Sequence, residues 1–498
     1  MRREIGIDLG TTNSVVATIE DGRIRPAENR EGNILTPSVV YFSEDEQATV
    51  GERALNLMIV RPTYCVSEVK RLMGDDVPAF IHPDTGQKYS PVEVSSLILK
   101  ELKEAAELYY GEPVESAVIT VPAYFNNEAR QATGEAANLA GLKVLRIANE
   151  PSMALRAYMF SHQDIRGIYA VLDLGGGTMD ISIAEVNDVE SKILTSDGDR
   201  RLGGTDFTMT IEKRIVEEFK KQRMEFDPQE PTDAVFLQDI REKAERAKRE
   251  LSKLDSATIA IMAKGTQIMM ELSRDEFEDL TKPYVDRVRE KCLSAIQRDA
   301  GEVSRLNGIV LVGGATRMPC IQQMIEELAE GVPVLKDVSQ DTAVAMGAAI
   351  EAYALSGKPT QFLPIRKMTD VTMFDIGIAA HKLGDSDPDR MFVGCIIPKG
   401  TPLPASQSRR FGVASMSGGG AAAPELIVCE GTENQEYDER TMKVQSFPLT
   451  GISPGSDPEE PRIEVTITVD ENGIITAEAL DLETGQRIRC EIQKKAIQ

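Results

Sequence analysis

One short pattern occurs twice in this chain and constrains its fold more than any other feature. Ile7–Thr12 reads IDLGTT and Leu172–Thr178 reads LDLGGGT, and their aspartates lie 165 positions apart. In both copies an apolar strand ends in aspartate and turns through glycine into hydroxyl residues. A second strand-like run follows at once, at Ser14–Ala17 and Asp180–Ile183. The repeat predicts two similar β-hairpins that face one another.

The chemistry of this pattern suits phosphate groups. Glycines let backbone N–H groups approach phosphate oxygens closely, and threonine hydroxyls add donors. An aspartate at a strand end can hold magnesium, usually through water. A single copy is more often only a tight hairpin, whereas two copies after buried strands favour a phosphate clamp. The chain has no GxxxxGK[ST] motif and no GxGxxG opening a helix, which argues against P-loop and Rossmann folds.

Residues 1–357 alternate strand-like and helix-like patterns, which indicates an α/β architecture. A helix is predicted to begin where Ser90 caps, Pro91 takes the first helical position and Glu93 completes a capping box. Buried strands are expected at 117–121, 169–172 and 308–312.

Two more segments could contact the base of a nucleotide. Val310–Pro319 reads as a buried strand that ends in two glycines before a helix, where a flat ring could approach the backbone. A helix running to about Leu254 carries polar residues at i, i+3, i+4 and i+7 on one face. These are Glu245, Lys248, Arg249 and Ser252, while Ile240, Ala244, Ala247, Leu251 and Leu254 occupy another face. Taken alone, each pattern is typical of an ordinary strand–helix turn or a solvated helix face.

The pattern changes after Gly357. Residues 358–370 carry two prolines and mixed polarity, which indicates an interdomain linker. Residues 371–498 contain short alternating runs and no long amphipathic helix, so an all-β domain is expected. Arg462–Val469 and Ile474–Ala477 predict a hairpin. Ser415–Pro424, rich in Gly and Ala, predicts a flexible loop.

Composition limits the partners and the compartment. The net charge of -24 repels nucleic acid and anionic lipid, so neither is an expected partner. No run approaches the eighteen or so apolar residues of a membrane span, and the start of the chain leaves no room for a signal peptide. The six cysteines show no CxxC spacing and the three histidines are dispersed, so we expect a cytoplasmic protein without a zinc or redox site.

At this point the motifs resemble those of the heat-shock protein 70 (DnaK-like) chaperone family. Ile5–Ser14, Asp173–Asp180 and Val310–Pro319 are similar to its three signatures. Further similar segments are Val121–Asn126, Asn149–Pro151 and Leu202–Phe207, and more loosely Asp370–Thr372, Gly377–Ile378 and Ile463–Ala477 in the β-rich half. The resemblance implies an actin-like (ribonuclease-H-like, duplicated) ATPase domain and a β-sandwich that binds peptide. It also implies an ATP-dependent chaperone, in which slow hydrolysis times the binding of exposed apolar segments of unfolded or misfolded proteins.

The resemblance assigns roles to individual residues. The implied catalytic residues are Lys70, Glu150, Asp173, Thr178 and Asp180, and Asp8 and Asp173 would hold Mg²⁺ through water. The implied ATP/ADP-binding residues are Gly10, Thr11, Thr12, Asn13, Gly175, Gly176, Gly177, Thr178, Gly203, Gly204, Glu245, Lys248, Arg249, Ser252, Gly313, Gly314, Arg317 and Asp341. A J-domain co-chaperone and a nucleotide exchange factor are implied partners, and Arg146 matches a residue that contacts such partners.

The chain departs from the family pattern in several places. The helical lid that follows the β-sandwich in the family is not present, so fast peptide release is expected. The linker reads Arg366–Thr369 where the family has a run of leucines, and a polar segment is expected to dock poorly. Ala315 replaces a small polar residue near the base. The groove candidates Val393, Ile396, Ile397 and Leu403 also fit core packing, and a few nearby linker residues, Phe362, Leu363 and Ile365, could replace the leucines.

Three other functions remain open from the residues. One is a small-molecule kinase on the actin-like scaffold, which would need a base aspartate and a sugar-sized pocket. Another is a regulator that uses nucleotide only as a conformational ligand, which Lys70, Thr178 and the two loop aspartates disfavour. A third is a filament-forming ATPase, which the appended β domain disfavours.

Overall fold

The computed structural model describes residues 3–228, 230–358, 365–382, 387, 390–413, 425–450, 452 and 460–489. The chain divides into two compact units: Met1–Phe125 with Gln131–Met368, and Asn126–Arg130 with Thr369–Gln498. Each unit is described by itself. Among the described residues, no helix has both the length and the apolar character needed to cross a bilayer.

The first unit contains a mixed sheet in the order β11-β10-β1-β2-β3, with β4 paired to β2. Its strands are β1 (Arg3–Asp8), β2 (Asn13–Glu20), β3 (Arg23–Pro26), β4 (Thr36–Pro37), β10 (Val114–Val121) and β11 (Lys143–Asn149). Strands β1, β10 and β11 run parallel, and β1-β2-β3 is an antiparallel meander. The first phosphate-loop pattern therefore occupies the β1–β2 turn.

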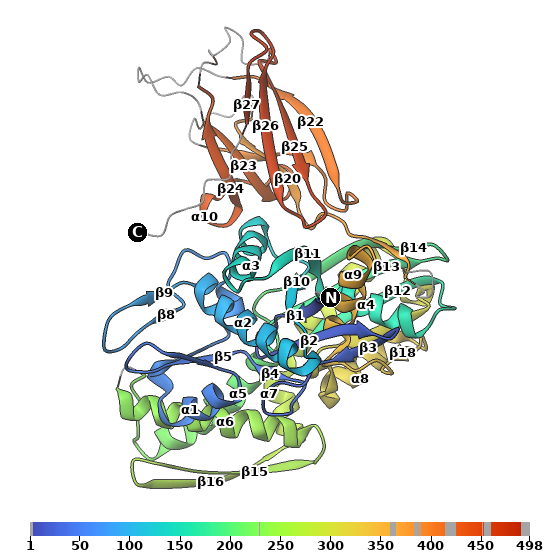
Figure 1. Ribbon diagram of the computed structural model, residues 1–498. Coiled ribbons are helices and arrows are strands. Elements are labelled where there is room, and N and C mark those ends of the chain that lie inside the picture. Colours follow the sequence, from blue (N-terminus) through green and yellow to red (C-terminus); the bar gives the residue numbers. More distant parts are fainter. Residues whose placement is uncertain are drawn as a thin grey trace. The chain divides into compact units, whose positions relative to one another are not determined.

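A second sheet repeats this arrangement in the order β18-β17-β12-β13-β14, with β19 added at the β14 edge (Figure 1). Its strands are β12 (Gly167–Leu174), β13 (Met179–Val186), β14 (Glu190–Asp199), β17 (Gly308–Val312), β18 (Val334–Leu335) and β19 (Lys367–Thr369). Strands β12, β17 and β18 run parallel, and β12-β13-β14 is an antiparallel meander. The predicted duplication is thus present in strand order and direction, as an actin-like ATPase domain requires.

Helices surround the two sheets. They are α1 (Glu52–Val60), α2 (Pro91–Tyr110), α3 (Asn127–Leu139), α4 (Glu150–Ser161), α5 (Gly204–Lys221), α6 (Pro231–Leu251), α7 (Arg274–Asp299), α8 (Pro319–Ala329) and α9 (Ala343–Leu355). The predicted capping box is confirmed at the start of α2, where Ser90 and Glu93 exchange hydrogen bonds. Helix α6 ends at Leu251 rather than near Leu254, which lies beyond the helix and is 57% exposed instead of continuing the apolar face.

Helix α9 lies buried between the first sheet and α4, and small residues permit this. A Cβ on Gly6 of β1 would lie 2.0 Å from the backbone nitrogen of Ala349, and one on Gly347 would lie 1.8 Å from the carbonyl oxygen of Met153 in α4. Both glycines are therefore needed for close approach of backbones. We call the part of the first unit around the first sheet the first lobe and the part around the second sheet the second lobe. Large buried side chains fill the core of the second lobe, including Phe207, Phe219 and Phe277, each contributing about 1.5–3 kcal/mol by burial.

Short elements complete the first unit. They are β5 (Val39–Phe42), β6 (Ala48–Val50), β7 (Cys65–Ser67), β8 (Phe80–Ile81), β9 (Lys88–Tyr89), the hairpin β15 (Ser256–Ala263) and β16 (Thr266–Ser273), and the 3₁₀ turns η1 (Pro62–Tyr64), η2 (Val69–Leu72), η3 (Val303–Arg305) and η4 (Gly314–Arg317). Turn η2, which carries Lys70, follows the end of β7, and η4 follows the end of β17.

The second unit, orange to red in Figure 1, is a β-sandwich. One sheet has the order β21-β20-β23-β24 and the other β22-β25-β26-β27. The strands are β20 (Asp375–Ala380), β21 (Phe392–Ile397), β22 (Ala405–Phe411), β23 (Glu425–Gly431), β24 (Lys443–Pro448), β25 (Ile463–Val469), β26 (Ile475–Asp481) and β27 (Arg487–Arg489), with one short helix, α10 (Glu439–Met442). The predicted hairpin is confirmed as β25–β26, whose residues alternate between buried and accessible.

One apolar core joins the two sheets of the sandwich and contains Ile396 and Ile397 together with strands β25 and β26. Val393 is also buried, and Leu403 packs against this core. The structure therefore shows these four residues in core packing, the alternative to a peptide groove that the sequence left open. The predicted Gly- and Ala-rich loop at Ser415–Pro424 lies outside the described residues, as do Phe362 and Leu363 of the linker.

The polar linker segment does pair with the first unit. Residues Lys367–Thr369 form β19, and the Lys367 N–H donates to the Val189 carbonyl at 3.1 Å. The Arg366 guanidinium donates to the carbonyls of Ile165, at 3.1 Å, and of Gln163. The expectation that a polar segment docks poorly is therefore wrong for Arg366–Met368, because backbone pairing and guanidinium–carbonyl bonds need no leucines.

Candidate functional site

The two glycine loops face one another at the ends of β1 and β12. A Cβ on Gly176 would lie 2.0 Å from the Thr12 hydroxyl, and one on Gly177 would lie 2.6 Å from the Thr11 methyl group. Within the second loop the Gly175 N–H donates to the Thr178 carbonyl at 3.0 Å. The structure therefore brings the two repeats together, and only glycine fits between them.

The first loop is held from its own side. The Gly10 N–H donates to the Ser14 hydroxyl at 3.2 Å, and the Ser38 hydroxyl donates to the Gly10 carbonyl at 2.8 Å. A Cβ on Gly10 would lie 2.0 Å from the Asn13 carbonyl oxygen. These contacts fix the loop geometry before any ligand binds.

The second loop is braced by the start of α5. The Gly204 N–H donates to the Gly175 carbonyl at 2.9 Å, and the Thr205 N–H donates to the Gly176 carbonyl at 2.7 Å. Gly203 packs on Gly177, where an added Cβ would meet backbone at 2.7 Å. The predicted residues Gly203 and Gly204 thus lie directly behind the predicted phosphate loop.

Lys70 lies among four carboxylates beside these loops. It is 4% exposed, and its ammonium group donates to Glu150. Burial alone would lower the pKa of Lys70, but the charges of Glu150 and Asp8 hold it above its ordinary value. The buried lysine therefore remains charged.

The carboxylates outnumber this single cation. Burial, followed by repulsion from Glu150, raises the pKa of Asp8 to about 7 and raises the pKa values of Asp173 and Asp180 well above their ordinary range. The Asp180 carboxylate accepts a hydrogen bond from the Ala123 N–H at 2.9 Å. Such a cluster is short of positive charge, which a divalent cation would supply.

The donor set fits a hydrated magnesium ion. Among the described residues, no three Asp, Glu, His or Cys side chains stand close enough to ligate a metal directly. Magnesium usually keeps several waters and takes one or two carboxylates besides phosphate oxygens. Asp8 and Asp173 are therefore suited to hold it through water, next to the phosphate loops.

The predicted base-binding residues of α6 form a cluster with the start of α5. Lys248 is buried and donates three hydrogen bonds, to the Gly204 carbonyl (2.9 Å), the Thr208 hydroxyl (2.9 Å) and the Glu245 carboxylate (2.6 Å). Burial opposes ionisation of Glu245, yet Lys248 and Thr208 lower its pKa to about 2. Burial also lowers the pKa of Lys248, because one carboxylate compensates the lost hydration only in part.

The other two residues of the predicted polar face are less constrained. Arg249 is exposed and pairs with Glu245 at 2.8 Å. The Ser252 hydroxyl donates to the Lys248 carbonyl at 3.2 Å and caps the end of α6. The polar face therefore has two parts. Arg249 is exposed and makes the i, i+4 pair expected of a solvated helix face, whereas Lys248 is buried.

The third motif, Val310–Pro319, covers the end of β17 and the turn η4. Gly313 has a φ of 81° and packs on the end of β12, since an added Cβ would lie 2.5 Å from an Asp173 carboxylate oxygen. Gly314 is exposed. Arg317 forms a bidentate pair with Asp341 (3.0 and 2.7 Å), which presents a flat guanidinium near this turn. The predicted residues Gly313, Gly314, Arg317 and Asp341 are thus neighbours.

Arg146 has a structural partner. Its guanidinium lies 2.6 Å from the Glu351 carboxylate, which Arg156 also approaches at 2.6 Å. All three side chains are at least mostly buried. The residue assigned to co-chaperone contact by resemblance therefore also joins β11 to α9.

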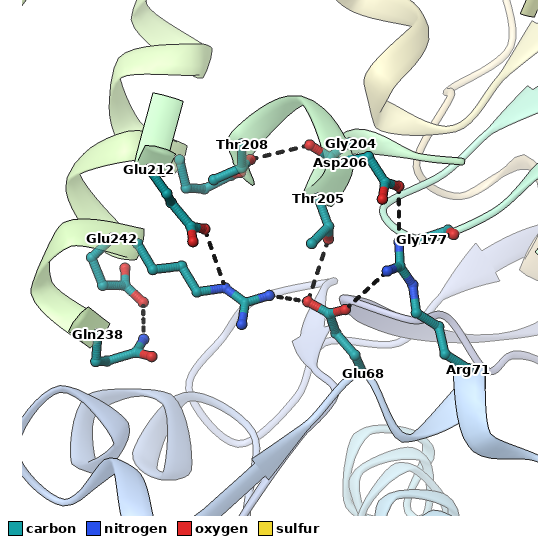
Figure 2. Close-up of polar contacts among 12 residues, drawn as sticks. Glu68, Arg71, Gly177, Gly204, Thr205, Asp206, Thr208, Glu212, Gln238 and Glu242 are labelled. Atoms are coloured by element: carbon teal, nitrogen blue, oxygen red, sulfur yellow. Dashed lines mark hydrogen bonds and ion pairs between the residues drawn. The ribbon is translucent and has the colours of Figure 1, made fainter. Parts of the chain in front are cut away.

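Sequence reasoning missed a polar network next to Lys70. Figure 2 shows Glu68, Arg71 and Asp206 joined by hydrogen bonds and ion pairs to the second phosphate loop and to α6. Arg71 and Asp206 lie 135 positions apart and neither belongs to a periodic pattern. Two local signals were available: Arg71 directly follows Lys70, and Asp206 lies within the Leu202–Phe207 segment.

Comparison with known protein families matches residues 4–498 to the family described as Hsp70 protein. The match covers nearly the whole chain, including both units, and gives no support to a small-molecule kinase or an uncoupled regulator. The chain therefore belongs to the Hsp70 family: it is an ATP-dependent chaperone that hydrolyses ATP with Mg²⁺ and binds unfolded peptide segments, and the family works with co-chaperones.

Proposed function

We propose that this chain hydrolyses ATP at the centre formed by Lys70 and its carboxylates, and that hydrolysis times peptide binding by the β-sandwich. One observation carries the proposal: Lys70 is buried and paired with Glu150 directly beside the two facing glycine loops. A fixed ammonium group at this place can stabilise negative charge that develops on a phosphoryl group.

The residues divide the reaction between them. Backbone N–H groups of Thr11, Thr12 and Asn13, and of Gly176, Gly177 and Thr178, would bind the β- and γ-phosphates. Gly10 and Gly175 shape the two loops, since their own N–H groups are bonded within the protein. Water attacks the γ-phosphorus while the bond to the bridging oxygen breaks, and Glu150 and Asp180 orient that water. Lys70 and the Thr178 hydroxyl stabilise the charge on the transferred group. Asp8 and Asp173 would hold magnesium through water, where the ion would supply positive charge against the phosphates.

The base would lie between two polar groups. Lys248 and Glu245 form one wall on α6, with Ser252 at its end, and Arg317 with Asp341 forms the other at η4. Arg249 and Arg317 are both exposed enough to change rotamer when a ring binds, and guanidinium planes stack readily on aromatic rings.

The partners follow from the same reading. Extended apolar peptide segments are the proposed clients, a J-domain co-chaperone and a nucleotide exchange factor the proposed regulators. Cysteines in the described residues, namely Cys65, Cys292, Cys320, Cys395 and Cys429, are free thiols, which supports a reducing, cytoplasmic location. We also propose 1–357, 358–370 and 371–498 as the functional division into ATPase, linker and peptide-binding parts.

The decisive experiment is single-turnover ATP hydrolysis by the full chain, with and without an apolar peptide. Lys70→Ala should slow hydrolysis on the order of 100-fold, because it removes a donor to the reacting group. Lys88→Ala, a change of an exposed lysine on β9, serves as the control and should keep the wild-type rate. Peptide should accelerate the wild type.

The outcomes separate the parts of the proposal. Hydrolysis by Lys70→Ala within about threefold of wild type would exclude this catalytic centre. A wild-type rate that ignores peptide would leave the centre intact and contradict its coupling to the β-sandwich.

A further inference from the structure

The turn that carries Lys70 is held from behind by its neighbour. Arg71 follows Lys70 in η2, and its guanidinium donates to the Gly177 carbonyl (3.0 Å) and to the Asp206 carboxylate (3.0 Å). The same Asp206 oxygen accepts the Gly203 N–H at 2.8 Å. Arg71 thus connects η2, which follows β7 near the first lobe, to the phosphate loop and to the start of α5 in the second lobe.

The contact with Gly177 is close. An added Cβ on Gly177 would lie 2.7 Å from the Arg71 Nε and 2.6 Å from the Thr11 methyl group. Gly177 is therefore enclosed by the first phosphate loop on one side and by Arg71 on the other. Among the described residues, Arg71 Nε is buried without a hydrogen-bond acceptor, an unfavourable state that the two bonds from the Nη2 atom of the same guanidinium offset.

Glu68 orients Arg71 and extends the connection. It lies 3.6 Å from Arg71 and accepts a hydrogen bond from the Thr205 hydroxyl at 3.4 Å (Figure 2). It also pairs with Arg241 of α6. Glu68 has a φ of 56°, a left-handed conformation that is unfavourable for a non-glycine residue. Strain of this kind persists only where the surroundings enforce it and is found near functional sites.

Arg241 brings the base side into the same network. It precedes Glu245 by one turn of α6, so the helix that presents Glu245 and Lys248 is also tied to the turn that presents Lys70. The side chains of Glu68, Arg71 and Asp206 are only 20%, 19% and 13% exposed, so water screens these charges less than it would at the surface.

We propose that Arg71 is a positioning residue for ATP hydrolysis, which holds the Lys70 turn against the second phosphate loop, and that Glu68 and Arg241 orient it from the base side. This inference rests on the proposed function of Lys70. Arg71 does not reach the reacting atoms; it sets the separation between the Lys70 ammonium group and the phosphate-binding N–H groups. A displacement of about 1 Å at such a distance can cost on the order of 100-fold in rate.

The test compares four variants of the full chain in single-turnover hydrolysis, with the Kd for ATP and ADP measured separately by equilibrium binding. They are Arg71→Met, which keeps the apolar stem, Arg71→Lys, Arg241→Met, and the control Arg214→Met, a partly buried arginine of α5 that pairs with Glu218 and Glu276 away from the loops. Unfolding midpoints are recorded for each.

Arg71→Met should slow the chemical step roughly tenfold or more while the Kd for ATP changes less than about threefold. Arg71→Lys should recover part of the rate, since one ammonium group can reach the Gly177 carbonyl but cannot match the forked geometry. Arg241→Met should show a smaller slowing, because it acts through Glu68. Arg214→Met should match the wild type at equal or greater loss of stability.

Two results would overturn the inference: an Arg71→Met rate within about twofold of wild type, or a loss of rate that scales with the fall in unfolding midpoint across all four variants, the control included. If Arg71→Met does not fold, Arg71→Lys decides by the same criteria. Failure of the underlying site is recognised independently, because Lys70→Ala would then retain hydrolysis whatever Arg71 does.

Discussion

Lys248, a proposed nucleotide-binding residue, also has a structural role. Two of its three hydrogen bonds, to Gly204 and Thr208, hold the start of α5 to α6, and α5 in turn braces the second phosphate loop through Gly204 and Thr205. Loss of its carboxylate partner should therefore affect folding stability even without nucleotide. At the sequence level this residue was indistinguishable from a solvated helix face, since burial is not visible in an i, i+3, i+4 pattern.

The pairing predicts a pH-dependent stability difference for Glu245→Gln. Because the folded pKa of Glu245 is about 2, below its ordinary value near 4.5, ionised Glu245 stabilises the fold above the unfolded-state pKa. The variant should lose about 1 kcal/mol of unfolding free energy at pH 7, and the difference should shrink as pH falls from about 4.5 toward 2. Urea unfolding of the nucleotide-free protein at several pH values measures it.

Glu250→Gln provides the control on the same helix, because Glu250 makes only an exposed i, i+4 pair with Arg246. It should change stability by less than about 0.5 kcal/mol. Equal losses in the two variants, or a Glu245→Gln difference that stays constant down to pH 3, would contradict the assigned pairing.

At the scale of elements, α9 is fixed by charge as well as by packing. Its Glu351 accepts from Arg146 on β11 and from Arg156 on α4, each at 2.6 Å. Burial would raise the pKa of Glu351, but the two guanidinium groups hold it below its ordinary value. Three elements thus meet at one carboxylate.

Removal of this shared carboxylate should be costly. Glu351→Gln removes the buried carboxylate that the Arg146 and Arg156 guanidinium groups share and should lower the unfolding free energy by about 3 kcal/mol, since breaking a buried charge network exceeds the cost of a surface pair. The matched change Glu326→Gln removes an exposed partner of Lys336 on α8 and should cost under about 1 kcal/mol. Denaturant midpoints of both variants decide, and similar values would show that the network adds little.

The elements also show what sequence could and could not predict. The duplicated hairpins, the α2 capping box and the β25–β26 hairpin each have a local signal, namely an Asp–Gly turn, an S-P-x-E start or alternation, so they were predicted with correct type and place. The predicted end of α6 was three residues too far along the chain. Leu254 continues the apolar spacing of the helix, but the helix itself ends at Leu251. Arg71–Asp206 and β19–β14 pair across long sequence separations and leave no local trace.

At the scale of the whole molecule, we propose that the linker carries communication between hydrolysis and peptide binding. In its described part, the Lys367 N–H donates to the Val189 carbonyl just before β14, and the Arg366 guanidinium donates to the carbonyls of Gln163 and Ile165. Those carbonyls follow the C-terminal end of α4, where the helix dipole favours a cation. Met368, 6% exposed, is the apolar counterpart. The polar segment Arg366–Met368 therefore binds the first unit through backbone and guanidinium hydrogen bonds instead of through leucines.

This docking predicts that Arg366→Ala weakens communication but leaves the basal reaction intact. The residue is partly exposed, so loss of its charge-assisted bonds should shift the docked state by about 1 kcal/mol, roughly fivefold. Peptide stimulation of single-turnover hydrolysis should fall accordingly, while the rate without peptide stays at the wild-type value, because Arg366 contacts neither loop nor carboxylate cluster. Arg487→Ala on β27, an exposed arginine that pairs with Glu478, is the control. Unchanged stimulation in Arg366→Ala would assign coupling to other residues, whereas a fall in the basal rate would mean that the linker acts on the catalytic centre itself.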